Sequence, residues 1–146
     1  MAEVNSGIVE EVLSVSNVSQ YKYDWLIDFG ATHHMCLHAR WFSNYQPIKN
    51  GVALMGNDFS CKILGAGSIK ISMSDGSVRM LTDVIHIPDL RKNLISMGVL
   101  DSVGYKFSVQ GEVMKVSMGA LVVMKAKRWL GTFISWMEEQ RSVMQQ

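Results

Sequence analysis

The residues best placed to do chemistry form the run Asp28-Phe29-Gly30-Ala31, which directly follows the apolar run Trp25-Leu26-Ile27. An aspartate at the end of a buried strand is held with little freedom, and a glycine two residues later permits a turn or a close approach that a side chain would block. A carboxyl held in this way can act as a general acid or base. The same pattern occurs in plain turns, so Asp28 is a candidate catalytic residue that needs support from its context.

A second group of reactive side chains comprises His33, His34, Cys36 and His38. Zinc accepts histidine and cysteine, and four ligands would suffice. The spacing fits no zinc pattern, and neighbouring residues of an extended chain point to opposite faces. We therefore interpret these residues as loop histidines with a buried cysteine, and we predict neither a metal nor a cofactor.

Short strands must position Asp28. Residues 68–73 and 78–85 alternate polar and apolar side chains on either side of an Asp75-Gly76 turn, which predicts a β-hairpin. Residues 105–109, 113–116 and 120–124 predict three further strands joined by tight turns. The spacing of Leu90, Leu94 and Met97 predicts one short helix, and Ser135 with Glu138 has the spacing of a capping box. The predicted fold is all-β: a small closed antiparallel barrel with one short helix and a possible C-terminal helix.

Composition narrows the class of protein. The chain has 146 residues, a net charge of +1 and two cysteines, which argues for one domain without a disulfide framework. No stretch approaches the roughly 18 apolar residues of a membrane span, so we expect a soluble, cytoplasmic protein with no membrane partner. We divide the chain into an N-terminal arm or edge strand (1–20), a barrel domain (21–134) and a divergent C-terminal tail (135–146).

Five stretches carry a family resemblance: Trp25 to Cys36, Leu54 to Asp58, Ile63 to Ile69, Asp83 to Leu90 and Asn93 to Gly98. In this order they resemble the retropepsin-like aspartic protease domain of copia-type retrotransposon (Gag-Pol) polyproteins. The similarity runs from about residue 21 to residue 134. The resemblance implies a homodimer in which each subunit donates one catalytic aspartate to a site on the two-fold axis.

On this resemblance Asp28 is the catalytic residue, and the substrate is a polypeptide. Gly30 and Ala31 would contact the substrate chain beside it. Gly65, Ala66 and Gly67 would bind substrate near the tip of a hairpin flap that closes over the peptide. The segment Asn93-Leu94-Ile95 would lie beside the catalytic loop and lead into the short helix.

Three features depart from the family pattern. The family has Ser or Thr at the position of Phe29, and that hydroxyl ties the two catalytic loops together across the dimer axis. Phe29 cannot make this hydrogen bond and its ring would crowd the contact, so we predict impaired proteolysis. Ser96 stands where retroviral relatives usually carry Gly. Residues 135–146 do not continue the family pattern.

Two alternatives to the enzyme stay open. The barrel could be a catalytically inactive structural or peptide-binding module, or the tail from Trp129 to Met144 could capture a protein partner. A basic stretch of Lys115, Lys125, Lys127 and Arg128 beside Trp129 could contact RNA by charge and stacking. Solvated strand and turn positions explain these cations as well, so no nucleic-acid partner is predicted.

Overall fold

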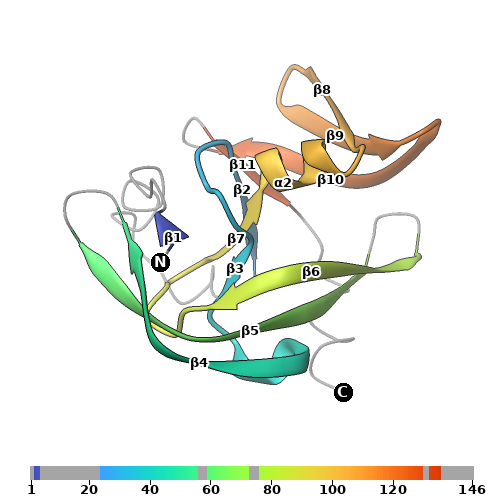
Figure 1. Ribbon diagram of the computed structural model, residues 1–146. Coiled ribbons are helices and arrows are strands. Elements are labelled where there is room, and N and C mark those ends of the chain that lie inside the picture. The colour runs from blue at the N-terminus through green and yellow to red at the C-terminus, as the bar shows by residue number, and fades with distance from the viewer. Residues whose placement is uncertain (1, 4–23, 56–58, 73–75, 130–131, 136–146) are drawn as a thin grey trace.

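Strands make up most of the computed structural model, which describes residues 2–3, 24–55, 59–72, 76–129 and 132–135 (Figure 1). The strands in these ranges are β1 (Ala2–Glu3), β2 (Trp25–Asp28), β3 (Met35–Cys36), β4 (Phe42–Leu54), β5 (Ser60–Ser72), β6 (Val78–His86), β7 (Asn93–Ser96), β8 (Lys106–Gln110), β9 (Val113–Met118), β10 (Leu121–Trp129) and β11 (Thr132–Ser135). Two short helical segments, η2 (Ala39–Trp41) and α2 (Met97–Ser102), interrupt them. The all-β prediction is confirmed. The possible C-terminal helix and most of the arm at 1–20 lie outside the described residues.

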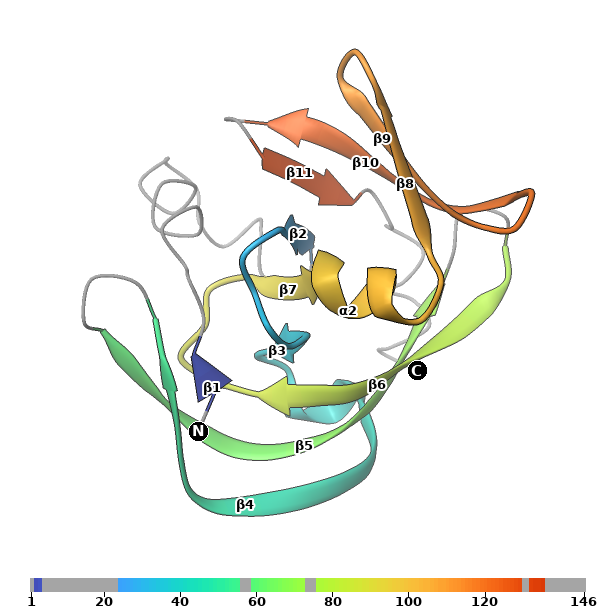
Figure 2. The ribbon, with the colours of Figure 1, turned by 45° about the horizontal axis from the view of Figure 1, so that its top comes forward.

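The strands form one sheet in the order β1-β4-β5-β6-β3-β7-β2-β11-β10-β9-β8. Most neighbours are antiparallel, as predicted, but three pairs are parallel: β2–β7 and β3–β6 at the centre of the sheet and β1–β4 at its edge. The long strands β4, β5 and β6 curve around β3 and β7, while β8 to β11 lie on the other side of β2 (Figure 2). β1 and β8 are the first and last strands of this order, and within the described residues they do not pair with each other.

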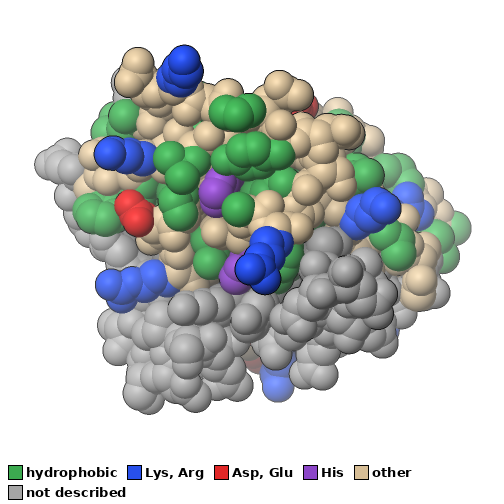
Figure 3. Space-filling model, turned by 90° about the horizontal axis from the view of Figure 1, so that it is seen from below, with side chains coloured by type: hydrophobic (Ala, Val, Ile, Leu, Met, Phe, Trp, Pro, Cys, Tyr) green, Lys and Arg blue, Asp and Glu red, His purple; other side chains and the backbone are tan. Residues whose placement is uncertain are grey.

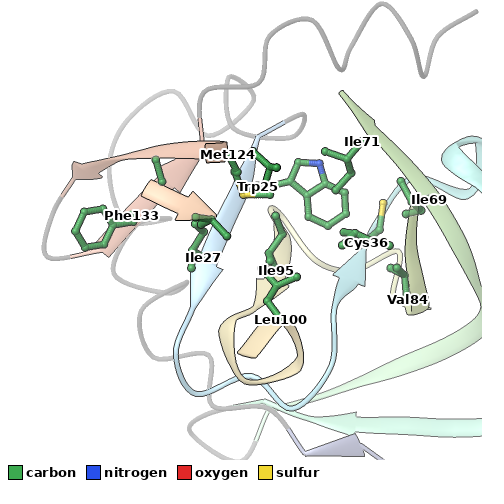
Figure 4. Close-up of a cluster of buried hydrophobic side chains, with 14 of the residues drawn as sticks. Trp25, Ile27, Cys36, Ile69, Ile71, Val84, Ile95, Leu100, Met124 and Phe133 are labelled. Carbon is green, nitrogen blue, oxygen red and sulfur yellow. The ribbon is translucent and has the colours of Figure 1, made fainter. Parts of the chain in front are cut away.

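The central strands β2 and β7 are buried on both of their faces. Trp25, Ile27 and Ile95 point into one hydrophobic cluster, which also includes Leu100 of α2 (Figure 4). Leu26 and Leu94 point the other way, into a second cluster with Met35 and Ile63. Burial on both faces explains why these strands read as continuous apolar runs instead of alternating patterns. It also fixes the end of β2, where Asp28 lies.

The hairpin predicted around Asp75-Gly76 is confirmed by the antiparallel pairing of β5 and β6, in which Ser72 lies opposite Val78. Gly76 has a positive φ of 86°, a conformation that glycine adopts without a steric penalty. The helix suggested by the spacing from Leu90 is wrong over its first part, because residues 93–96 form β7. The helix begins only at Met97, after Ser96 caps it.

Apolar side chains are also exposed on the outer strands. Ile48 of β4, Leu64 of β5 and Met80 of β6 are each more than a third exposed. Figure 3, seen from the side on which β4 lies in Figure 1, shows hydrophobic side chains gathered around histidines, with lysine and arginine side chains scattered around them. Among the residues in the described ranges, no helix has both the length and the apolar character needed to span a bilayer.

Candidate active site

Asp28 ends the doubly buried strand β2, and its side chain is only 1% exposed. Its Oδ1 accepts a hydrogen bond from the backbone N–H of Gly30 at 2.8 Å. Its Oδ2 is buried and has no hydrogen-bond partner among the described residues. Burial raises the pKa of the carboxyl above its usual value, and the backbone N–H groups of Gly30 and Ala31 oppose this shift in part. Asp28 is therefore a positioned carboxyl that retains its proton to a higher pH than an exposed aspartate does.

Ser96, the register partner of Asp28 on β7, connects the aspartate's loop to the helix that follows. Its hydroxyl donates to the backbone carbonyl of Ala31 at 2.7 Å and accepts from the backbone N–H of Val99 at 3.1 Å. The second bond makes Ser96 the N-cap of α2. The departure from glycine at this position thus gives the domain a side chain that holds the loop after Asp28.

His34 completes this connection from the loop side. The backbone N–H of Ser96 donates to His34 Nδ1 at 2.9 Å, so the imidazole must be unprotonated at that nitrogen. Burial lowers the pKa of His34 to about 4; the neighbouring His33 also lowers the pKa, and the Asp83 carboxylate opposes these effects. Our sequence interpretation treated His34 as an ordinary loop histidine and missed this role. A Ser immediately before a helix is a usable N-cap signal, whereas nothing local links residue 34 to residue 96.

Asn93, at the start of β7, joins three segments around the site. Its side-chain amide accepts from the backbone N–H of Leu37 at 3.1 Å and donates to the backbone carbonyl of Asp24 at 3.1 Å. The parallel pairing of β2 and β7 confirms that Asn93-Leu94-Ile95 lies beside the strand of Asp28 and leads into α2. Next to it, burial lowers the pKa of Lys92 to about 8, against the opposing effect of the Asp24 carboxylate.

Phe29 lies at the surface, where 51% of its side chain is exposed. It follows a fully buried aspartate and precedes an exposed glycine, so the loop turns outward at this residue. Phe29 also provides no hydroxyl to bond a neighbouring loop.

The predicted position of Gly65, Ala66 and Gly67 at a flap tip is wrong. All three lie in the middle of β5, where Gly65 pairs with Pro47 of β4 and with His86 of β6. In the strand order β6, β3 and β7 stand between them and the strand of Asp28. The connection from β4 to β5 includes residues 56–58, which lie outside the described residues.

The glycines of β5 make room for aromatic rings instead. A Cβ on Gly65 would overlap the ring of Tyr45, whose hydroxyl is hydrogen-bonded to His86 Nδ1 at 2.8 Å. A Cβ on Gly67 would lie 2.8 Å from the carbonyl oxygen of Ser43 and 3.2 Å from the ring of Phe42. The motif that resembles a flap thus has a packing role, and its contact with substrate stays a prediction.

The reactive side chains between 33 and 38 do not converge. In the described part of the chain, no three His, Cys, Asp or Glu side chains form a group that could hold a metal ion. His38 stacks on Trp41 with ring centroids 4.1 Å apart. Cys36 is fully buried, which raises its pKa to about 12 and disfavours the thiolate that a metal would require.

These features define an all-β domain with a single buried carboxyl at the end of its central strand. The chain belongs to the family described as Pol polyprotein, beta-barrel domain, which matches residues 25–105. This confirms the expected origin in a transposon polyprotein. The family description names a β-barrel and no activity.

Relatives from three organisms support this assignment. The Retrovirus-related Pol polyprotein from transposon TNT 1-94 of Nicotiana tabacum is 34% identical over 128 residues, which are 86% of this chain and 10% of that protein. A transposon Ty5-1 protein of Saccharomyces cerevisiae is 36% identical over 51% of this chain and 47% of its own length. The Retrovirus-related Pol polyprotein from transposon RE2 of Arabidopsis thaliana is 37% identical over 51% of this chain and 5% of its own length. The chain thus spans less than half of each of these relatives, and no solved structure matches it.

Proposed function

We propose that this domain is the aspartic endopeptidase part of a copia-type retrotransposon polyprotein, that it acts in the cytoplasm as a homodimer, and that Phe29 impairs it. The observation that carries the proposal is the state of Asp28. One carboxylate oxygen is held by the loop backbone, and the other is buried without a partner among the described residues. A second Asp28 from another copy would satisfy that oxygen by sharing a proton with it.

The chemistry follows from bringing two such carboxyls together. Two carboxylates at about 3 Å cannot both ionise, so the pair holds one proton between them. Burial raises the pKa of each isolated Asp28, which shifts the carboxyl in the direction of its protonated form. In the dimer, the ionised aspartate takes a proton from a water molecule that attacks the peptide carbonyl. The protonated aspartate stabilises the developing oxyanion and then assists departure of the amine.

The loop beside Asp28 is built to hold its position during this reaction. The Ser96 hydroxyl donates to the carbonyl of Ala31, and His34 accepts a hydrogen bond from the backbone N–H of Ser96. Both loop residues are therefore hydrogen-bonded to the last residue of β7. Gly30 is exposed, and its backbone would be open to an extended peptide. We assign substrate contact to Gly30 and Ala31 on this basis.

A second function is favoured by Phe29. Its exposed ring stands where the family hydroxyl would join two loops across the dimer axis, and it cannot make that hydrogen bond. A domain that keeps its fold while losing this bond would serve as an inactive structural or peptide-binding module. The two functions differ in one measurable respect, which is whether the site cleaves peptides once the hydroxyl is restored.

The test compares the full chain with Phe29→Ser and with Phe29→Ser combined with Asp28→Asn, on peptides that span the Pol polyprotein junctions at a pH of about 5. We expect weak or no cleavage by the natural chain, clear cleavage by Phe29→Ser, and none by the double variant. Absence of cleavage in all three would reject the enzyme and favour the inactive module. Cleavage that persists in the double variant would show that Asp28 is not the catalytic residue.

Dimerisation is tested separately by the mass in solution from light scattering. Each chain supplies one aspartate in an Asp-x-Gly-Ala motif, so a two-aspartate site requires two copies. We expect Phe29→Ser to shift the mass toward the dimer relative to the natural chain. A strict monomer in both proteins would contradict the proposed site.

A further inference from the structure

The strand register brings four lysines onto one face of β8, β9 and β10. Lys115 lies directly opposite Lys125, and Lys106 lies opposite Ser117, which shares the face of Lys115. Lys127 is two residues beyond Lys125 on the same side of β10. Lys106, Lys115 and Lys127 are exposed and Lys125 is half-buried. The opposite face of these strands contributes Met114, Val116 and Ala126 to the hydrophobic core.

The lysines on this face, called the lysine face below, are not balanced by acids on the same strands. β8, β9 and β10 contain no Asp or Glu, and the nearest acid along the chain is Glu112 in the turn between β8 and β9. Arg128 does not join the face, because its guanidinium lies over the Phe133 ring at 5.0 Å from the centroid. The chain as a whole has a net charge of +1, so this concentration of positive charge is local.

The arrangement acts against the stability of the isolated fold. Like charges directly opposite each other on neighbouring strands repel, and the Lys115–Lys125 pair is in that position. A bound polyanion would turn this repulsion into attraction. The pairing therefore supports a binding role better than a purely solvated one, which was the interpretation from sequence spacing alone.

The chemistry of the face selects the kind of anion. The polar residues on this face are Ser108, Ser117 and Gln110, which can donate hydrogen bonds to phosphate oxygens. The register also places the half-buried Val113 and Val122 on the face. No large exposed apolar side chain lies among these face residues, so the face lacks the anchors of a membrane-binding surface. The lysines are spread over three neighbouring β-strands, a width of about 10 Å. A flexible single-stranded nucleic acid can bend to place several phosphates across this width. A stiff duplex would contact the face only along one line.

We propose that the lysine face binds single-stranded nucleic acid through its phosphates. The inference does not depend on cleavage at Asp28, because it rests on a different part of the sheet. Binding is expected to be independent of base sequence, since no base-reading side chain is needed. The affinity should fall steeply with salt as counterions are released.

The test measures fluorescence anisotropy of labelled oligouridine RNA with the full chain over a range of salt concentrations. With about four phosphate contacts, the plot of log K against log salt should have a slope of about −3. The variant Lys115→Gln, Lys125→Gln, Lys127→Gln should lower the affinity at least about tenfold and bring the slope to about −1. The matched control is Lys49→Gln, Lys62→Gln, Lys70→Gln, which removes three exposed lysines from β4 and β5.

The control should keep the affinity within about threefold of the natural chain and preserve the slope. Circular dichroism establishes that both variants fold. Three results would overturn the proposal: no RNA binding at low salt, equal losses in the two triple variants, or tighter binding to duplex DNA or phosphatidylserine vesicles than to the RNA. Selective loss in the Lys115, Lys125, Lys127 variant supports it.

Discussion

The imidazole of His34 accepts a hydrogen bond from the backbone N–H of Ser96 at 2.9 Å, although the two residues are 62 positions apart in the sequence. This bond joins the loop after Asp28 to β7, and it exists only while Nδ1 carries no proton. Ser96 in turn holds Ala31 through its hydroxyl. The position of the candidate catalytic loop is therefore linked to the protonation state of a buried histidine.

The free energy of unfolding is expected to fall as the pH is lowered from about 6.5 to about 4. His34 has a pKa of about 4 in the folded chain, against an ordinary value of 6.5. Over this range the unfolded chain binds a proton that the folded chain does not, so acid favours unfolding. The contribution is about 1.4 kcal/mol per pH unit, or on the order of 3 kcal/mol in all, measurable by urea denaturation at each pH.

The variant His34→Asn isolates this contribution, because an asparagine oxygen can accept the Ser96 N–H without titrating. We expect its unfolding free energy to depend much less on pH between 6.5 and 4 than that of the natural chain. His33→Asn, a change at the adjacent half-buried histidine, serves as the matched control and should keep most of the steep dependence, because burial of His34 lowers its pKa more than His33 does. Equal slopes for the natural chain and His34→Asn would contradict the assignment.

Asp28 should have the opposite effect on stability. Its folded pKa is raised, so its favourable contribution is present below pH 3.8 and is lost as the pH rises through the folded pKa. Asp28→Asn removes a buried charge at neutral pH. We expect it to raise the unfolding free energy at pH 7 by more than the roughly 0.5 kcal/mol typical of surface changes, and to have little effect at pH 3.

Asp101→Asn provides the comparison for this variant, because Asp101 is an exposed aspartate in α2. Its unfolding free energy should stay within about 0.5 kcal/mol of the natural value at both pH values. A lower stability of Asp28→Asn at pH 7 would contradict the raised pKa of the Asp28 carboxyl.

Local sequence was sufficient where structure is determined by neighbours. The Asp75-Gly76 turn predicted the β5–β6 hairpin, and the apolar run ending at Asp28 predicted a buried strand with the carboxyl at its end. Both features depend on residues within a few positions of each other. The family resemblance placed Asn93-Leu94-Ile95 beside the loop of Asp28, but the parallel pairing of β2 with β7 was not predicted, and periodicity alone suggested a helix there.

The failures arose where distant segments decide the structure. The spacing of Leu90 and Leu94 suits a helix, but residues 93–96 lie between β2 and β3 and bury both faces, which only a strand can do there. Gly65 and Gly67 were interpreted as part of a flexible tip. The aromatic rings that occupy the space beside them lie 20 or more residues away in the sequence, so nothing local indicated a packing role. The sequence showed Lys115, Lys125 and Lys127 as a basic stretch, but not that they share one face with Lys106, because that depends on the register of three strands.

Gly65→Ala should destabilise the domain by about 1–3 kcal/mol, because the added methyl group overlaps the Tyr45 ring and displaces it from His86. Gly98→Ala is the control: in α2 its Cβ would meet nothing closer than Ser96 Oγ at 3.8 Å. A helical alanine should raise stability by about 0.5–1 kcal/mol. Thermal unfolding measures both variants. A neutral Gly65→Ala would show that the Tyr45 ring does not require the space beside this glycine.

Lys115→Gln should stabilise the free domain by about 0.2–1 kcal/mol at low salt, because it removes the repulsion between Lys115 and Lys125 on adjacent strands. The gain should shrink as salt screens the two charges. Lys106→Gln is matched to it in charge, but Lys106 lies opposite Ser117 and should gain less. Urea denaturation at two salt concentrations measures all three proteins. A gain that is equal for both variants, or that does not depend on salt, would show that the Lys115–Lys125 pair carries no repulsion.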